Sequence, residues 1–334
     1  MSRAVVVETP GSFRLVPHTP RPPGPGEALV RVHAVGICGS DREVHQGNRP
    51  AGYVRYPLTP GHEWSGTVAG VGEGVPGALV GRRAVGEGFR NCQVCERCHA
   101  GDTTLCTAGY AETGFTEPGA MAPTLTLPAR LLHLLPDGAD LTAAALLEPA
   151  ACVAAAALKA GVRPGDRVAV VGTGTLGMLA AQLLTASSPA ELLMVGIRAG
   201  REETARAFGA TAYRLHDEVR GDEGFDVVVE AAGAASAAST SASLLRRGGR
   251  LVLTGIPSPG ADGLDPTDLV VRQLEVHTVF GAPPGAWAHA VRAFAAGLLA
   301  PLPLVTHELP LADFGRAMDL VGGGPRVGKV LLRP

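Results

Sequence analysis

The chain has 334 residues, of which 46% are hydrophobic and 18% charged, with a formal net charge of −2. This length favours two domains, and the balanced charge argues against a nucleic-acid partner, which calls for a large basic excess. We see no apolar run near the roughly 20 residues that cross a bilayer and no apolar signal-peptide core at the N-terminus, so we expect a cytoplasmic protein without a membrane partner.

Residues 1–145 are predicted to be rich in short strands. Runs such as "AVVVE", "EALVRVHAVGI" and "SGTVAGVGEGV" are β-rich and are broken by Gly and Pro. From about Glu148 the chain becomes Ala- and Leu-rich and then alternates strands with helices, through "DRVAVV", "ELLMVGIR", "REETARAFGA", "GFDVVVEAAG" and "GRLVLTGIP". This alternation predicts a parallel sheet with helices on both faces. The tail from about Pro283 carries a helix around "AWAHAVRAFAAGLL" and the strand-like "VGKVLLRP".

Four of the six cysteines lie close together in the segment "NCQVCERCHAGDTTLC". The positions are Cys92, Cys95, Cys98 and Cys106, in the spacing C-x2-C-x2-C-x7-C. Four thiolates suit a closed, tetrahedral, structural Zn²⁺ site that leaves no position for a substrate. The iron–sulfur alternative is disfavoured, because the ferredoxin pattern has a three-residue last gap followed by Pro. Disulfides are disfavoured in the reducing cytosol.

A glycine pattern in "VAVVGTGTLG" predicts a dinucleotide site. Gly172, Gly174 and Gly177 have the spacing G-x-G-x-x-G, between an apolar strand and an Ala/Leu-rich helix. The turn and the helix N-terminus, including Thr175 and Leu176, are expected to bind the pyrophosphate. The alternative is a glycine-rich turn without a nucleotide.

The following strand addresses the choice between the two nicotinamide cofactors. An NAD site usually has an acidic residue at the end of this strand, but here the strand ends in Gly196 and the first acid is Glu202. Arg198 and Arg201 are nearby, and guanidinium groups suit a 2′-phosphate. We therefore expect NADP to be preferred over NAD, unless these arginines only line a solvated loop.

Further candidate ligands are scattered along the chain. "GICGSD" offers Cys38, "PGHEWSGTV" offers His62 and Glu63, and "LLEPAAC" offers Glu148. Their separation gives no local ligand spacing. Together with the four-cysteine segment, "GTGTLG" and the terminal "GKVLL", in this order, they resemble the zinc-dependent medium-chain dehydrogenase/reductase family. The similarity is greatest to its polyol (sorbitol), sugar and threonine dehydrogenase branches, and it covers essentially the whole chain.

The resemblance implies a site for each reaction component. Cys38 and His62 would bind a catalytic zinc, with Glu148 as third ligand and Glu63 binding directly or through water. Ser40 would contact the substrate oxygen and begin a proton relay. With the four-cysteine site this makes two zinc ions per chain. The implied activity is hydride transfer between NAD(P) and a secondary alcohol, that is, a polyol, sugar, aminocyclitol or amino alcohol.

Some roles near this site stay open. Asp41 is expected either to accept a hydrogen bond from the second ring nitrogen of His62 or to cap a turn. The second relay member is unassigned, because Glu43 stands where some alcohol dehydrogenases have His, and His45 has a different register. Cys152, four residues beyond Glu148, is expected to pack in the interior.

The resemblance also implies the domain organisation. A GroES-like, β-rich catalytic domain would comprise residues 1–148 and 283–334, with the structural-zinc lobe at about 88–110. A Rossmann-type doubly wound nucleotide domain would comprise residues 149–282. We expect a homodimer or homotetramer. The alternatives are a catalytically inactive nucleotide-binding relative and a zinc-independent quinone or enoyl reductase on the same scaffold.

Overall fold

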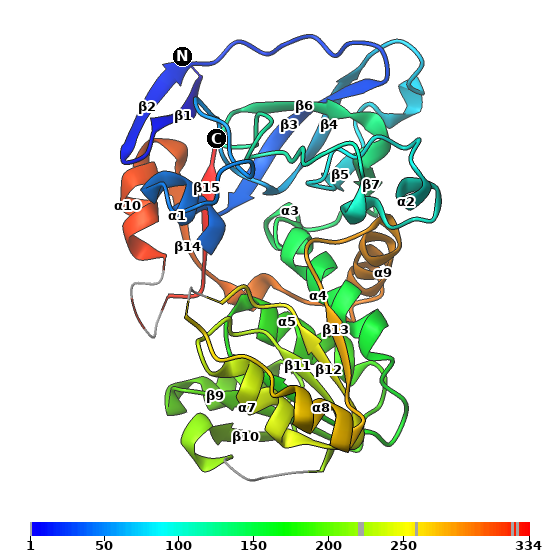
Figure 1. The fold of residues 1–334 in the computed structure, drawn as a ribbon. Helices are drawn as coiled ribbons and strands as arrows, with labels where there is room; N and C mark the ends of the chain where they lie inside the picture. The colour runs from blue at the N-terminus through cyan, green and yellow to red at the C-terminus, as the bar shows by residue number, and fades with distance from the viewer. Residues whose placement is uncertain (1, 220–223, 258–259, 322–323, 325–326) are drawn as a thin grey trace. The chain divides into compact units, whose positions relative to one another are not determined.

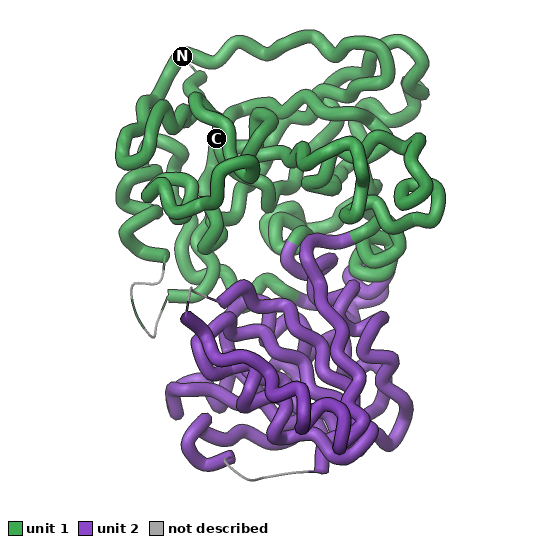
Figure 2. Tube along the Cα trace, in the orientation of Figure 1, with its two compact units in different colours: residues 1–148, 283–291, 301–334 green, residues 149–282, 292–300 purple. Residues whose placement is uncertain are grey.

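The structure is a computed structural model that describes residues 2–219, 224–257, 260–321, 324 and 327–334. The chain divides into two compact units, coloured separately in Figure 2. Unit 1 comprises Met1–Glu148, Pro283–Val291 and Pro301–Pro334, and unit 2 comprises Pro149–Ala282 and Arg292–Ala300. The segment Arg292–Ala300, which the sequence analysis places in the catalytic domain, clusters with unit 2, where Ala300 exchanges hydrogen bonds with the side chain of Gln182.

Unit 1 is built on a mostly antiparallel sheet of seven strands in the order β14-β15-β3-β4-β5-β7, with β6 paired to β3 (Figure 1). Its large apolar side chains, including Trp64, Leu127 and Phe314, form the main core. A separate antiparallel hairpin joins β1 and β2. The strands are β1 (Arg3–Thr9), β2 (Ser12–Pro17), β3 (Glu27–Gly36), β4 (Glu63–Val71), β5 (Arg83–Gly86), β6 (Thr124–Pro128), β7 (Leu132–Leu134), β14 (Val305–Pro310) and β15 (Lys329–Arg333).

The helices of unit 1 are short and lie in the connections between strands. They are α1 (Gly39–Gln46), α2 (Glu96–His99), α3 (Leu141–Ala144) and α10 (Phe314–Leu320), while α9 (Pro284–Ala295) begins in unit 1. Helix α1 begins after Cys38, and it ends at Gly47, whose φ of 78° provides the left-handed cap that glycine adopts at low cost.

Unit 2 contains a parallel six-stranded sheet in the order β10-β9-β8-β11-β12-β13. Its strands are β8 (Arg167–Val171), β9 (Glu191–Gly196), β10 (Ala212–Leu215), β11 (Phe225–Glu230), β12 (Leu245–Leu253) and β13 (Glu275–Thr278). The helices are α5 (Thr175–Thr185), α6 (Glu202–Ala207), α7 (Ala237–Leu244) and α8 (Pro266–Arg272), and α4 (Leu147–Ala160) leads into the unit. The strand order reverses between β8 and β11, which is the doubly wound arrangement.

The predicted fold class is confirmed, because a strand-rich unit and a parallel α/β unit are both present. The apolar, nearly uninterrupted β8 and β11 are buried on both faces of their sheet, as parallel strands require. Among the helices of the described ranges, none combines the length and the apolar character needed to span a membrane.

Candidate functional site

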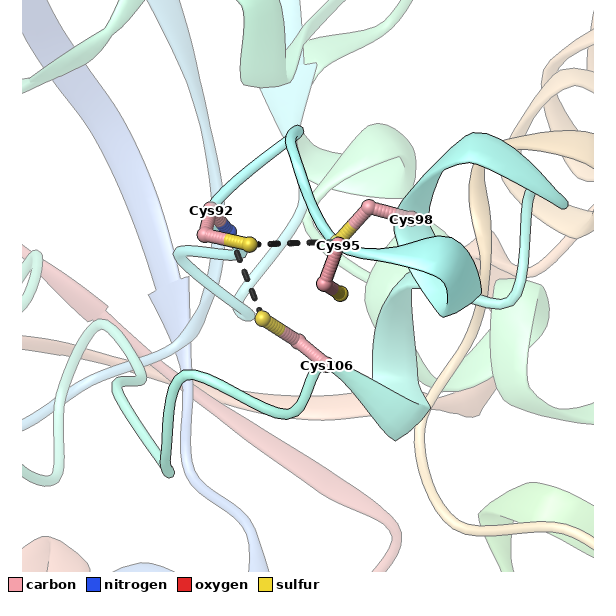
Figure 3. Close-up of side chains that lie close together, drawn as sticks. All are labelled: Cys92, Cys95, Cys98 and Cys106. Carbon is pink, nitrogen blue, oxygen red and sulfur yellow. Dashed lines mark hydrogen bonds between the residues drawn. The ribbon is translucent and has the colours of Figure 1, made fainter.

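The four clustered cysteines converge in the connection between β5 and β6 (Figure 3). One ligand atom from each of Cys92, Cys95, Cys98 and Cys106 lies within 4.8 Å of the others. The Sγ atoms of Cys92 and Cys98 are 3.9 Å apart, and the backbone N–H of Cys92 donates to Sγ of Cys106 at 3.4 Å. All four cysteines are free thiols.

The acidities of these thiols differ because their surroundings differ. Backbone N–H groups of Thr107 and Cys98 lower the pKa of Cys95 to about 5, whereas burial raises the pKa of Cys98 to about 12. A thiolate stabilised by backbone N–H groups thus lies beside a buried thiol. Both sulfurs are suitable ligands for a soft divalent cation. Four converging sulfurs therefore fit a structural zinc.

A second cluster combines Cys38, His62 and Glu63, whose ligand atoms also lie within 4.8 Å of one another. Antiparallel pairing of β3 with β4 explains how they meet, because Gly36 at the end of β3 is opposite Glu63 at the start of β4. Cys38 follows β3 by two residues and His62 precedes β4 by one. The sheet thus brings together a thiol, an imidazole and a carboxylate, which suit zinc in combination.

Asp41 has a different geometry from the one expected for a partner of the histidine ring. Its Oδ2 accepts the backbone N–H of Cys38 at 2.9 Å, which caps α1. Its Oδ1 is 3.7 Å from Nδ1 of His62, which is too long for a hydrogen bond but close enough for a charge interaction. Burial by itself lowers the pKa of His62, but Asp41, Cys38 and the charge of Glu148 together outweigh it and raise that pKa well above its usual value.

Glu148 lies outside the tight group of ligand atoms, which among the described residues contains three members. Burial raises the pKa of its carboxyl to about 7, and the charges of His62 and Glu63 act on it in opposite directions. Glu148 is therefore within electrostatic reach of the cluster, and its carboxylate form needs a cation nearby. Ser40 lies in the first turn of α1 and is partly exposed.

Lys329 is a member of this site that the sequence analysis did not assign. It begins β15, is 5% exposed and forms an ion pair with Glu63, which is 1% exposed. Its Nζ donates to Oε1 of Glu63 at 2.6 Å and to the carbonyl oxygen of Ile37 at 3.1 Å. Burial by itself lowers the pKa of Lys329, but the negative charges of Glu63, Cys38 and Glu148 together outweigh it, so that pKa is raised. The only feature of the sequence that could have pointed to Lys329 is a charged residue directly before the apolar run "VLL".

The charges of this buried site fit a cation. Glu63 and Glu148 supply two carboxyl groups and Cys38 a thiol, against the single ammonium of Lys329 and the ring of His62. Buried carboxylates are costly unless paired. Because Glu63 is paired with Lys329, the thiol of Cys38, the ring of His62 and the carboxyl group of Glu148 are the donors that a divalent ion would bind.

Unit 2 carries the predicted nucleotide turn at the carboxyl end of β8. Gly172 has a φ of 122°, and Gly174 is the N-cap of α5. A Cβ at Gly177 would lie 2.0 Å from the carbonyl oxygen of Gly172, so the close packing of turn and helix requires glycine there. Thr175 and Leu176 form the first turn of α5, whose free N–H groups suit a phosphate.

The end of β9 is shaped by a tyrosine that the sequence analysis also missed. The hydroxyl of Tyr213, on β10, donates to the carbonyl oxygen of Arg198 at 2.6 Å. A Cβ at Gly196 would lie 2.2 Å from that hydroxyl. A side chain at the position where NAD sites place an acid would therefore require Tyr213 to move, and the backbone of Arg198 is held by a hydrogen bond.

Comparison with known proteins agrees with this architecture. The sequence profile of the alcohol dehydrogenase GroES-like domain matches residues 24–137, and that of the zinc-binding dehydrogenase domain matches residues 175–296. The 2-dehydro-3-deoxy-L-galactonate 5-dehydrogenase of Pseudoalteromonas atlantica is 32% identical, and the match covers 96% of this chain and 95% of the relative. The sorbitol dehydrogenase of Halalkalibacterium halodurans is 31% identical, with 96% and 95% covered.

A solved structure is similar over the same extent. A Sinorhizobium meliloti protein described as a zinc-binding dehydrogenase and bound to NADP has a TM-score of 0.92 and 28% identity, with 100% of this chain and 99% of that chain covered. The chain belongs to the zinc-type medium-chain dehydrogenase/reductase family. It is an oxidoreductase of the class that couples alcohol oxidation to NAD(P), with a GroES-like unit 1 and a Rossmann-type unit 2.

Proposed function

We propose that unit 1 binds a catalytic zinc through Cys38 and His62, with Glu148 as third ligand, and a structural zinc through the four-cysteine lobe. The convergence of Cys38, His62 and Glu63 within 4.8 Å carries the Cys38 and His62 part of this proposal, and the electrostatic coupling of Glu148 to His62 and Glu63 supports Glu148 as third ligand. Bound zinc supplies a Lewis acid that makes an alcohol hydroxyl more acidic. Lys329 holds the Glu63 carboxylate and offsets its charge. This pairing favours Glu63 as a neighbour of the ion over a permanent ligand.

The proposed substrate is a secondary alcohol in a polyol, sugar, aminocyclitol or amino alcohol. The relatives named for sorbitol and for a sugar acid support a polyhydroxylated substrate. Ser40, two residues after Cys38, is proposed to accept the hydroxyl proton and pass it into a relay; a nicotinamide cofactor, when bound, would supply the hydride acceptor. The reduced cysteines suit a cytoplasmic location.

A substrate screen and metal analysis test the assignment together. Purified protein is expected to contain zinc at both clusters and to oxidise members of these alcohol classes with NADP or NAD. Cofactor binding without turnover of any alcohol, in zinc-replete protein, would favour the inactive relative. Activity that survives removal of all zinc would favour a quinone or enoyl reductase.

We further propose that NADP is preferred over NAD. The support is the Tyr213 hydroxyl in the space that an acid at position 196 would need, the two arginines beyond Gly196 and the hydrogen bond from Tyr213 to the backbone of Arg198. The NADP-bound S. meliloti protein is consistent with this choice.

Arg198→Ala is expected to raise the KM for NADP about tenfold and to leave the KM for NAD nearly unchanged, because only NADP offers a 2′-phosphate to a guanidinium. Steady-state kinetics with both cofactors measures the effect. Arg206→Ala is the matched control, since the guanidinium of Arg206 is hydrogen-bonded to the carboxylate of Glu202 on α6. An equal change for both cofactors would refute the phosphate contact.

The stabilisation by zinc is expected to grow with pH. In the metal-free protein Glu148 has a pKa near 7, above its ordinary 4.5, so its contribution to stability is present below pH 4.5 and is lost as pH rises through about 7. His62, with its raised pKa, acts in the same direction. Zinc binds the deprotonated groups and removes this loss.

Thermal melts of zinc-loaded and chelator-treated protein at about pH 5 and about pH 8 measure this dependence. The zinc-induced rise in Tm should be larger at the higher pH. Glu148→Gln has no ionisable carboxyl and should show a weaker dependence. A pH dependence identical in the variant and the wild type would contradict the role of Glu148.

We propose that the chain forms a homodimer or homotetramer through the β13 edge of unit 2. Valines 270, 271 and 276 and Phe280 are exposed along this edge and α8, with Val270 at 76%. An exposed strand edge can pair with a second copy of itself, and the apolar side chains beside it would then be buried. Val276→Lys should lower the mass measured by sedimentation, whereas Val80→Lys, on unit 1, should not. An unchanged mass for Val276→Lys would rule out this edge.

A further inference from the structure

Glu230 is a buried carboxylate in unit 2. It belongs neither to the glycine pattern of residues 172–177, the nucleotide fingerprint, nor to the arginines beyond β9. It ends β11 and is 2% exposed. Its Oε1 accepts the backbone N–H groups of Ala232 and Gly233, each at 2.7 Å, and its Oε2 accepts that of Gly255 at 3.1 Å. One side chain thus satisfies three backbone donors from two loops.

These loops follow neighbouring strands and approach each other closely. The first comprises residues 231–233 after β11, and the second comprises residues 254–256 after β12. A Cβ at Gly255 would lie 2.3 Å from the backbone nitrogen of Gly233 and 2.7 Å from Oε2 of Glu230. The backbone carbonyl of Glu230 also accepts the N–H and the hydroxyl of Thr254. Any displacement of the carboxylate would therefore move both loops.

The same loops adjoin the nucleotide fingerprint. Ala231 donates its N–H to the carbonyl of Val171 at 2.8 Å, and a Cβ at Gly172 would lie 2.8 Å from the carbonyl carbon of Ala231. The sheet order places β11 beside β8 at the point where the strand order reverses. In this fold the dinucleotide lies outside the carboxyl ends of the strands at that point. The fingerprint belongs to the first half of the sheet, and the Glu230 loops belong to the second.

We propose that Glu230 is a positioning residue that presets the two loops for the nicotinamide half of the dinucleotide; this inference rests on the cofactor use proposed above. A trans peptide directs each carbonyl opposite to the following N–H. The three N–H groups that point to Glu230 therefore turn the carbonyls of Ala231, Ala232 and Thr254 away from it. These carbonyls therefore face away from the Glu230 carboxylate and are available to other hydrogen-bond donors, such as a carboxamide.

The chemistry requires a carboxylate. An ionised carboxylate only accepts hydrogen bonds, so it can serve all three donors at once. A glutamine of the same shape brings an NH₂ group that cannot accept, and it leaves at least one buried N–H without a partner. Backbone N–H groups converging on one anion also offset the cost of burying its charge.

The test compares the affinity for the intact cofactor with the affinity for its adenosine part, which the half of the sheet that carries the fingerprint binds. For Glu230→Gln we expect the Kd of NADPH to rise about tenfold, while the Kd of 2′,5′-ADP stays within about twofold of the wild type. If the wild type prefers NADH, NADH and 5′-ADP are the probes. Fluorescence and calorimetric titrations of the full chain supply both constants.

Asp226→Asn is the matched control, because Asp226 lies at the other end of β11 and binds the backbone of Arg167 and the side chain of Arg246. Asp226→Asn should lower Tm without weakening the binding of NADPH. Gly255→Ala introduces a side chain into the second loop beside the Glu230 carboxylate, so it should reproduce the Glu230→Gln result. It carries the test if Glu230→Gln does not fold.

Unchanged NADPH affinity in Glu230→Gln, or an equal loss for NADPH and the adenosine fragment, would overturn the role of Glu230. A wild type that binds neither cofactor would contradict the proposed cofactor use, and this inference with it.

Discussion

Cys38→Ser is expected to lower kcat about a thousandfold while the chain remains folded. The thiol is one of three donors within 4.8 Å at this site, and a serine hydroxyl is neither soft nor anionic at neutral pH. A Lewis acid contributes several kcal/mol to a reaction of this kind, and each ~1.4 kcal/mol is a factor of ten in rate. The measurements are kcat, zinc content and circular dichroism.

Cys98→Ser is the matched control, because it also removes a thiol from a predicted zinc site, but from the four-cysteine lobe. It should lose zinc and lower Tm, while the protein that remains folded should keep nearly full kcat. The contrast separates a chemical role from a structural one. Wild-type turnover in zinc-depleted Cys38→Ser would refute the proposed catalytic ion.

Lys329→Met is expected to lower the free energy of unfolding by about 3–5 kcal/mol, because it leaves the carboxylate of Glu63 buried without its partner. Chemical denaturation measures this loss. The double variant Lys329→Met/Glu63→Gln should recover much of the stability, since neither charge is then left alone.

Arg316→Met is the control for removal of an exposed cation, because its pair with Asp313 is solvated and should contribute at most about 1 kcal/mol. Failure of the double variant to recover any stability would show that Lys329 acts through its packing and not through Glu63. A Lys329→Met variant as stable as Arg316→Met would contradict the buried ion pair itself.

The elements that the sequence predicted well are those with a strong local pattern. The apolar runs of β8, β9 and β11 were recognised because each is buried along most of its length, and β12 was recognised from its apolar second half. The four-residue edge strands β10 and β13 were not, because they are partly exposed and have little periodicity. The tail helix was recognised, but its end at Ala295 lies with unit 2, which no local signal indicates.

The candidate site divides in the same way. The spacing of the four cysteines and of the three glycines is local, so the sequence alone predicted those groups. Grouping Cys38 with His62 and Glu148 depended on the family resemblance. The structure adds the pairing of β3 with β4 that joins the first two, and it places Glu148 outside the tight group.

What the sequence by itself determined is therefore the class of fold, the four-cysteine lobe and the nucleotide turn, because neighbouring residues encode each of them. Only the tertiary structure decided that Lys329, 266 positions from Glu63, is its ion-pair partner, and that Tyr213 fills the space beside Gly196. The physical reason is that strand pairing joins distant segments, and the cost of burying a charge or filling a space depends on what those segments bring together.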